Sequence, residues 1–175
     1  AALTALHSVP VSAEAVLLVD AASGKVLHAE HATYPWYPAS LTKLMTTYVT
    51  LKAVTEHRIS MNSLITVSER AHAEQPSKMG FPPGTELTVD NALKMMMVKS
   101  ANDMAVTLAE GVAGSVENFA LEMNTTAERL GRTQTHYDNP NGRPDAGKVT
   151  SARELAILAR ALMHDFPQSD LCWHM

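Results

Sequence analysis

Cysteine, aromatic residues and long apolar runs are all scarce in this sequence. Its 175 residues include one cysteine, Cys172, and 5% aromatic residues. One cysteine cannot form an internal disulfide, so a small disulfide-stapled fold is excluded. Apolar stretches such as 15–19 and 95–98 fall far short of the ~20 residues that a membrane-spanning helix needs.

Runs of one charge sign are absent as well. The sequence has 14 Lys and Arg against 18 Asp and Glu, a formal charge of −4. Binding to nucleic acid or to an anionic membrane surface needs clustered positive charge, so we expect no nucleic-acid partner. With 46% hydrophobic residues, the chain is long enough for one domain with a sizeable core.

Hydrophobic spacing predicts one hairpin followed by about five helices. The hairpin is expected from two strand-like runs, 14–20 and 25–30, joined by a turn that contains Gly24. A short strand is expected at 65–67 and a loop at 68–85. The expected helices are about 40–57, 88–98, 102–110, 116–130 and 151–164. A lone hairpin is marginally stable, so it needs further strands or a covering helix.

The first residues, 1–13, are small or apolar and end in Val11-Ser12-Ala13. This pattern is typical of the end of an export signal with its small-residue cleavage site. A flexible N-terminal arm is the alternative interpretation. The first interpretation predicts an exported protein.

Ser40 and Lys43 open the first long predicted helix with a spacing of three. That spacing puts the hydroxyl and the amine on one helical face, where the amine can accept the hydroxyl proton if burial lowers its pKa. The helix N-terminus would stabilise negative charge near Ser40. The alternative is an N-cap serine followed by a surface lysine.

Ser100-Ala101-Asn102 forms a second candidate site between two predicted helices. A serine there can relay a proton, and an asparagine side chain can both donate to and accept from a substrate amide. Helix capping is the alternative role for Ser100. His28 and His31 lack the further ligands that a metal site needs, so we expect no metal and no other cofactor.

These motifs together resemble the serine D-alanyl-D-alanine carboxypeptidases among the low-molecular-mass penicillin-binding proteins, over about residues 14–167. The matching blocks, in order, are Pro38-Ala39-Ser40-Leu41-Thr42-Lys43, Gly84-Thr85-Glu86-Leu87-Thr88-Val89, Val98-Lys99-Ser100-Ala101-Asn102-Asp103, Asn139-Pro140-Asn141-Gly142 and Val149-Thr150-Ser151-Ala152-Arg153-Glu154-Leu155-Ala156. The resemblance implies an α+β, β-lactamase/transpeptidase-like fold. Its helical half would be nearly complete, and its antiparallel sheet would be represented only by the N-terminal hairpin.

The resemblance also implies roles for the candidate residues. Ser40 would be the acylating nucleophile, Lys43 its general base, Ser100 a proton relay and Asn102 a contact to the substrate amide. The implied substrate is a peptidoglycan stem peptide ending in D-Ala-D-Ala, and β-lactams would acylate the same serine.

Two departures from the family stand out. Arg143 occupies a position where the family usually has leucine, and no lysine or histidine is followed by Thr-Gly, which is the family's third motif. Residues 168–175 do not match the family. We therefore expect a catalytic domain truncated before that motif, and weak or no activity of this chain alone.

Two other functions stay open on the sequence. One is a catalytically dead remnant that binds peptidoglycan or a partner, or a homo-oligomer that exchanges strands through its hairpin edge. The other is a serine β-lactamase. Ser-Ala-Asn in place of Ser-Asp-Asn, and the lack of a Glu-x-x-Leu-Asn motif, favour the carboxypeptidase.

Overall fold

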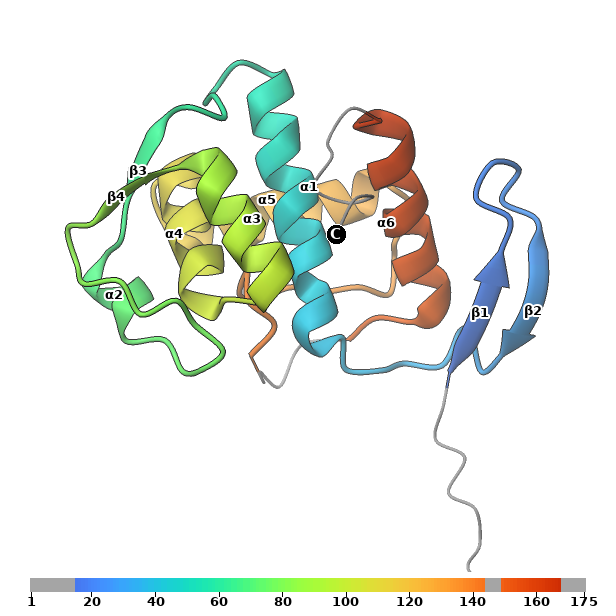
Figure 1. The fold of residues 1–175 in the computed structure, drawn as a ribbon. Coiled ribbons are helices and arrows are strands. Elements are labelled where there is room, and N and C mark those ends of the chain that lie inside the picture. The colour runs from blue at the N-terminus through green and yellow to red at the C-terminus, as the bar shows by residue number, and fades with distance from the viewer. Residues whose placement is uncertain (1–14, 144–148, 168–175) are drawn as a thin grey trace, which may run out of the picture.

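The computed structural model describes residues 15–143 and 149–167. A β-hairpin comes first, a cluster of helices follows, and the last helix, α6 (Ala152–Asp165), returns to lie beside the hairpin (Figure 1). The predicted arm at 1–13 and the unmatched tail at 168–175 fall outside the described residues.

The hairpin forms as predicted. Its strands, β1 (Val16–Val19) and β2 (Val26–Glu30), are antiparallel, with a register irregularity after Leu18. Gly24 closes the turn with φ 74°, a left-handed conformation that favours glycine. Apart from each other, the hairpin strands pack mainly on α6, through β1. Much of the apolar surface of the hairpin therefore stays exposed.

Five long helices form close to their predicted positions. They are α1 (Thr42–Thr55), α3 (Val89–Lys99), α4 (Asn102–Ala113), α5 (Val116–Arg129) and α6. Thr88, Ser115 and Ser151 each cap a helix by accepting a hydrogen bond from the backbone amide three residues ahead. The carboxylate of Glu154 does not complete a capping box, because it accepts instead from Gln134 and Thr135.

The predicted end at residue 110 of the third expected helix, 102–110, is wrong. Helix α4 continues through Gly111 to Ala113, and Gly114 is its C-cap, with a left-handed φ of 78°. A Cβ at Gly111 would lie 2.4 Å from Cγ2 of Ile65, so glycine here allows close packing against a neighbouring strand rather than ending the helix.

The segment expected as a loop at 68–85, with its flanks, holds more structure than predicted. Strand β3 (Leu64–Thr66), which includes part of the predicted 65–67 strand, pairs antiparallel with β4 (Glu86–Thr88), and the short helix α2 (Glu69–His72) lies between them. Helix α2 and strand β4 have only four and three residues, too few to show a hydrophobic period, so neither was predicted.

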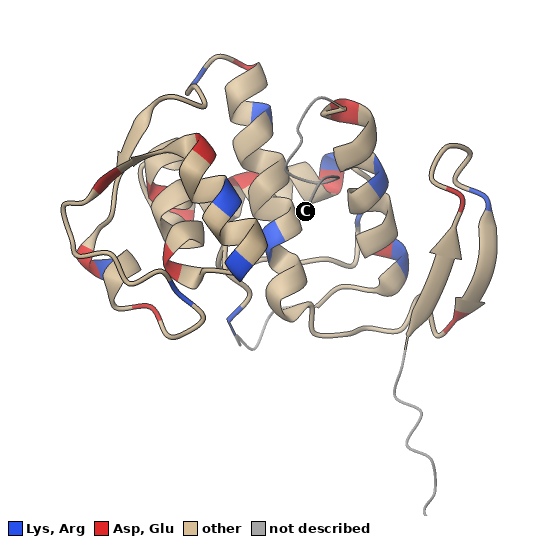
Figure 2. Ribbon diagram, in the orientation of Figure 1, with Lys and Arg blue, Asp and Glu red and all other residues tan. Residues whose placement is uncertain are grey.

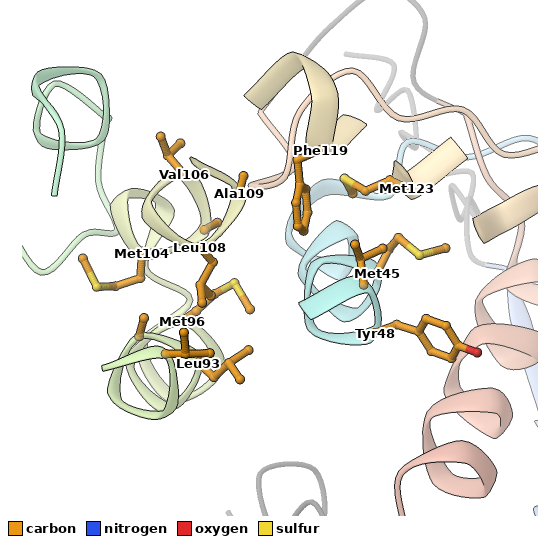
Figure 3. Close-up of a cluster of buried hydrophobic side chains, with 14 of the residues drawn as sticks. Met45, Tyr48, Leu93, Met96, Met104, Val106, Leu108, Ala109, Phe119 and Met123 are labelled. Carbon is orange, nitrogen blue, oxygen red and sulfur yellow. The ribbon is translucent and has the colours of Figure 1, made fainter. Parts of the chain in front are cut away.

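The core lies among α1, α3, α4 and α5. Figure 3 shows side chains from these helices meeting around α4, including Met45 of α1, Met96 of α3, Leu108 of α4 and Phe119 of α5, each fully buried. Every residue of α4 from Asn102 to Ala109 is buried. The polar residues at its start are therefore held in a fixed place by a packed helix.

Lys, Arg, Asp and Glu residues are spread along the helices, with both charge signs interspersed (Figure 2). Within the described residues, none of the helices combines the length and the apolar character needed to cross a membrane.

Candidate active site

Ser40 and Lys43 lie together at the head of α1, as their spacing predicts. Ser40 is in a short 3-10 turn, η1 (Ala39–Leu41), just ahead of α1, and Lys43 is in the first turn of α1. The residue Ser40 is exposed, whereas Lys43 is only 3% exposed. The interpretation as an N-cap serine with a surface lysine is wrong, because Leu41 occupies the cap position and Lys43 is buried.

The Lys43 amine has three hydrogen-bond partners. Nζ lies 2.8 Å from Oδ1 of Asn102, 2.7 Å from the carbonyl oxygen of Asn141 and 3.5 Å from Oγ of Ser40. A neutral amine has two N–H donors and one lone pair. If the two short contacts take both donors, the lone pair is left facing the Ser40 hydroxyl, which is the arrangement that a general base requires.

Burial lowers the pKa of Lys43 to about 8, from the usual 10.5. The negative charge of Glu74 acts in the opposite direction and raises this pKa. A lysine with a pKa near 8 has a sizeable fraction of free amine at neutral pH, so its environment supports proton transfer from a serine.

Asn102 orients its amide between α1 and the 75–77 segment. Its Nδ2 donates to the carbonyl of Gln75 at 2.9 Å and its backbone amide donates to Ser77 at 2.8 Å. These contacts leave Oδ1 directed at Lys43. The structure thus brings Asn102 into direct contact with the lysine.

Ser100 lies at the α3–α4 junction but is not bonded to the other site residues. It ends α3 in a left-handed conformation, with φ 56°. Among the hydrogen bonds of the described residues, none involves its hydroxyl. Of the four residues predicted for the site, the structure brings Ser40, Lys43 and Asn102 together and leaves Ser100 nearby.

Sequence reasoning missed Asn141 as a site residue. The 139–142 segment had a strong turn signal, but the group that contacts Lys43 is a backbone carbonyl, which any residue type can supply. Thr46 Oγ1 anchors this turn by donating to Pro140 at 2.6 Å. At Gly142, φ is 81° and a Cβ would lie 1.9 Å from the carbonyl oxygen of Ala39, so the turn packs tightly against the Ser40 segment.

Asp103, the neighbour of Asn102, was also missed. Its buried carboxylate accepts hydrogen bonds from the backbone amides of Met79 and Gly80 at 2.8 to 3.0 Å. The start of α4 therefore holds both ends of the 75–80 segment. The 75–80 segment is thereby held in a fixed position beside Lys43.

Comparison with known proteins agrees with this arrangement. The family model described as D-alanyl-D-alanine carboxypeptidase matches residues 2–171. The D-alanyl-D-alanine carboxypeptidase DacC of Escherichia coli is 38% identical over 164 residues, which are 90% of this chain and 41% of DacC.

Two solved structures are similar to this fold. The D-alanyl-D-alanine carboxypeptidase DacD from Francisella tularensis has a TM-score of 0.89 at 32% identity, covering 94% of this chain and 40% of its own. Penicillin binding protein 6B from Escherichia coli has a TM-score of 0.81 at 36% identity, covering 85% of this chain and 49% of its own.

The helical body and its hairpin define the class of the protein as the penicillin-binding proteins with a β-lactamase/transpeptidase-like fold. Within that class, the chain belongs to the D-alanyl-D-alanine carboxypeptidase family. It spans about two fifths of the length of DacC, the curated relative described above.

Proposed function

We propose that this chain carries the acylation centre of a serine D-Ala-D-Ala carboxypeptidase that acts on peptidoglycan stem peptides outside the cytoplasm. The observation that supports this most directly is the buried Lys43 amine, which contacts Ser40, Asn102 and the Asn141 carbonyl at once. The proposal extends to β-lactams, which would acylate the same serine, since one similar structure is a penicillin binding protein.

In the proposed reaction, Lys43 accepts the hydroxyl proton as Ser40 Oγ attacks the carbonyl of the penultimate D-alanine. The tetrahedral intermediate collapses, the C–N bond breaks, and D-alanine leaves after its amine gains a proton. Ser100 would relay that proton from its position at the start of the α3–α4 junction. Water then hydrolyses the Ser40 ester, with Lys43 again accepting a proton.

The chain alone is expected to be a weak catalyst. In the family, the Lys-Thr-Gly strand anchors the substrate carboxylate and supplies one oxyanion-hole donor, and that motif does not occur in this sequence. Loss of a single oxyanion-hole donor costs about 3 kcal/mol of transition-state stabilisation. We therefore expect slow, substoichiometric acylation of the isolated chain.

Fluorescent penicillin followed by peptide mass spectrometry tests the proposal. We would compare the chain alone with a chimera in which the part of DacC that follows the matched segment is joined to this chain. The chimera should be labelled stoichiometrically at Ser40, and Ser40→Ala and Lys43→Ala versions of it should not. A folded chimera that is never labelled, or that is labelled equally after Ser40→Ala, would contradict the assignment.

The same assay separates the alternatives. A carboxypeptidase retains the penicillin adduct, whereas a β-lactamase releases it by rapid turnover. A remnant that only binds peptidoglycan would retain binding in the chimera without any adduct. Solution mass distinguishes a strand-exchanged homo-oligomer from a monomer.

A further inference from the structure

An ion pair joins the two loops that flank the Lys43 amine. Nη1 of Arg143 lies 3.3 Å from Oε2 of Glu74. Arg143 follows the turn whose Asn141 carbonyl contacts Lys43, and Glu74 precedes the Gln75 carbonyl that orients Asn102. The Glu74 side chain is only 11% exposed and the Arg143 side chain is 49% exposed.

These contacts form a closed ring that passes through the amine itself. From Lys43 the ring passes through the Asn141 carbonyl and two peptide units to Arg143. The ion pair then leads to Glu74, and the neighbouring Gln75 carbonyl leads through the Asn102 side chain back to Lys43. The ion pair is the link of this ring that connects the two loops to each other.

We propose that Glu74 and Arg143 are positioning residues for Lys43: their ion pair holds the two loops together, and thereby holds the Asn102 and Asn141 acceptors on the amine and restricts its access to solvent. The assignment of Lys43 as the base rests on the proposed function. The role of the ion pair in holding the amine is independent of that function.

Other charged groups near these loops have their own partners. Asp103 caps the amides of Met79 and Gly80, and Lys78 donates to the carbonyl of His72 at 2.7 Å. Neither is a partner of the Lys43 amine. Among the described residues, the Glu74–Arg143 pair is the ion pair that joins the segment next to Gln75, which orients Asn102, to the turn that carries Asn141.

Competitive acetylation of the whole chain tests this proposal without any catalysis. Trace acetic anhydride, applied over a pH series and read by peptide mass spectrometry, gives the reactivity of each neutral lysine amine separately from its pKa. Lys94 and Lys25 serve as internal references. The variants are Arg143→Leu, Glu74→Gln, the double variant, and Arg143→Lys as a conservative rescue.

Arg70→Leu is the matched control, because it breaks the Arg70–Glu117 ion pair and its arginine is also 49% exposed. We expect Arg143→Leu and Glu74→Gln each to raise the neutral-amine reactivity of Lys43 about threefold, the size that a partly exposed ion pair supports. In the double variant the reactivity of Lys43 should rise no further than in the more affected single variant, since both substitutions remove the same ion pair. Arg143→Lys should stay near the wild-type value, and Arg70→Leu should leave Lys43 unchanged.

Unchanged Lys43 reactivity in both single variants would overturn the proposal, as would additive effects or an equal change in Arg70→Leu. Thermal unfolding of each variant shows whether it is folded. If Arg143→Leu does not fold, Glu74→Gln tests the same ion pair. A negative acetylation result would not bear on the acylation of Ser40. A negative penicillin-labelling result would not bear on the role of the ion pair.

Discussion

At the scale of single residues, the site combines an exposed serine with a buried lysine. Ser40 faces solvent, where a substrate can reach it, while Lys43 is held among acceptors inside the fold. Burial favours the neutral form of an amine, and hydrogen bonds from that amine fix its direction. The two residues of one short motif therefore have opposite environments, which suits a nucleophile and its base.

The pH dependence of Lys43 follows from its pKa of about 8. Its acetylation should rise with a midpoint near pH 8, below the usual lysine pKa of 10.5. Between these pH values the unfolded chain binds a proton that the folded chain has lost, so the free energy of unfolding should increase as the pH rises through this window. Competitive acetylation and denaturant titrations at pH 8 and pH 10 measure both effects. A Lys43 midpoint at the ordinary lysine value would contradict this picture.

Spacing and motif order predicted Ser40, Lys43 and Asn102 as site residues, and the structure brings these three side chains together. They could not identify Asn141, because it contributes a backbone oxygen, nor Glu74, because a single glutamate in a loop carries no spacing signal. The burial of Lys43 was predicted only as a condition for catalysis. It is realised because α1 packs against α4, which is a tertiary contact that no local pattern encodes.

At the scale of elements, the turn over 139–142 packs directly against the segment that carries Ser40. Gly142 has a left-handed φ, and the Ala39 carbonyl occupies the space that a side chain would need. Tyr37 reinforces this contact by donating from its hydroxyl to the Gly142 carbonyl at 2.9 Å. The position of the Asn141 carbonyl therefore depends on a glycine one residue away.

Gly142→Ala should destabilise the fold and disturb the site. We expect a cost of about 3 kcal/mol, from the left-handed backbone and from the clash with Ala39 together. Gly131→Ala is the matched control, because its φ of 74° is similar but nothing lies within 4 Å of the added Cβ, and it should cost only about 1 kcal/mol. Denaturant unfolding measures both values, and equal costs would show that the Ala39 contact is unimportant.

Long helices were predictable because their caps and apolar spacing are local. Thr88, Ser115 and Ser151 cap their helices by side-chain hydrogen bonds that depend on residues only three positions away. The β3–β4 pair was not predictable, since it joins segments about twenty residues apart through strands of three residues each. The predicted helix end at residue 110 was wrong because the role of the next residue, Gly111, is set by Ile65 on another element.

At the scale of the whole molecule, packing is uneven. The helices share one core around α4, while the hairpin packs mainly on α6. Leu18, Val26 and Leu27 on the hairpin are each more than half exposed. A helix buried on all sides and a hairpin held by one neighbour should open with different free energies.

Hydrogen exchange should resolve this difference. We expect hairpin amides to exchange at least ~100-fold faster than amides in the middle of α4, because a hairpin with few tertiary contacts opens without global unfolding. Exchange followed by mass spectrometry on the intact chain measures both segments in one sample. Hairpin protection equal to that of α4 would contradict the prediction, and protection that grows with protein concentration would indicate strand exchange between copies.

The exposed hairpin has a consequence for the lifetime of the protein in a cell. Within the described residues the hairpin pairs with no third strand, and an open strand edge beside the exposed Leu18, Val26 and Leu27 is the kind of surface on which chains aggregate. Small changes in the population of open forms alter the share of a protein that quality-control proteases remove. Substitutions on this hairpin should therefore affect the amount of protein that accumulates more than the activity of each folded molecule.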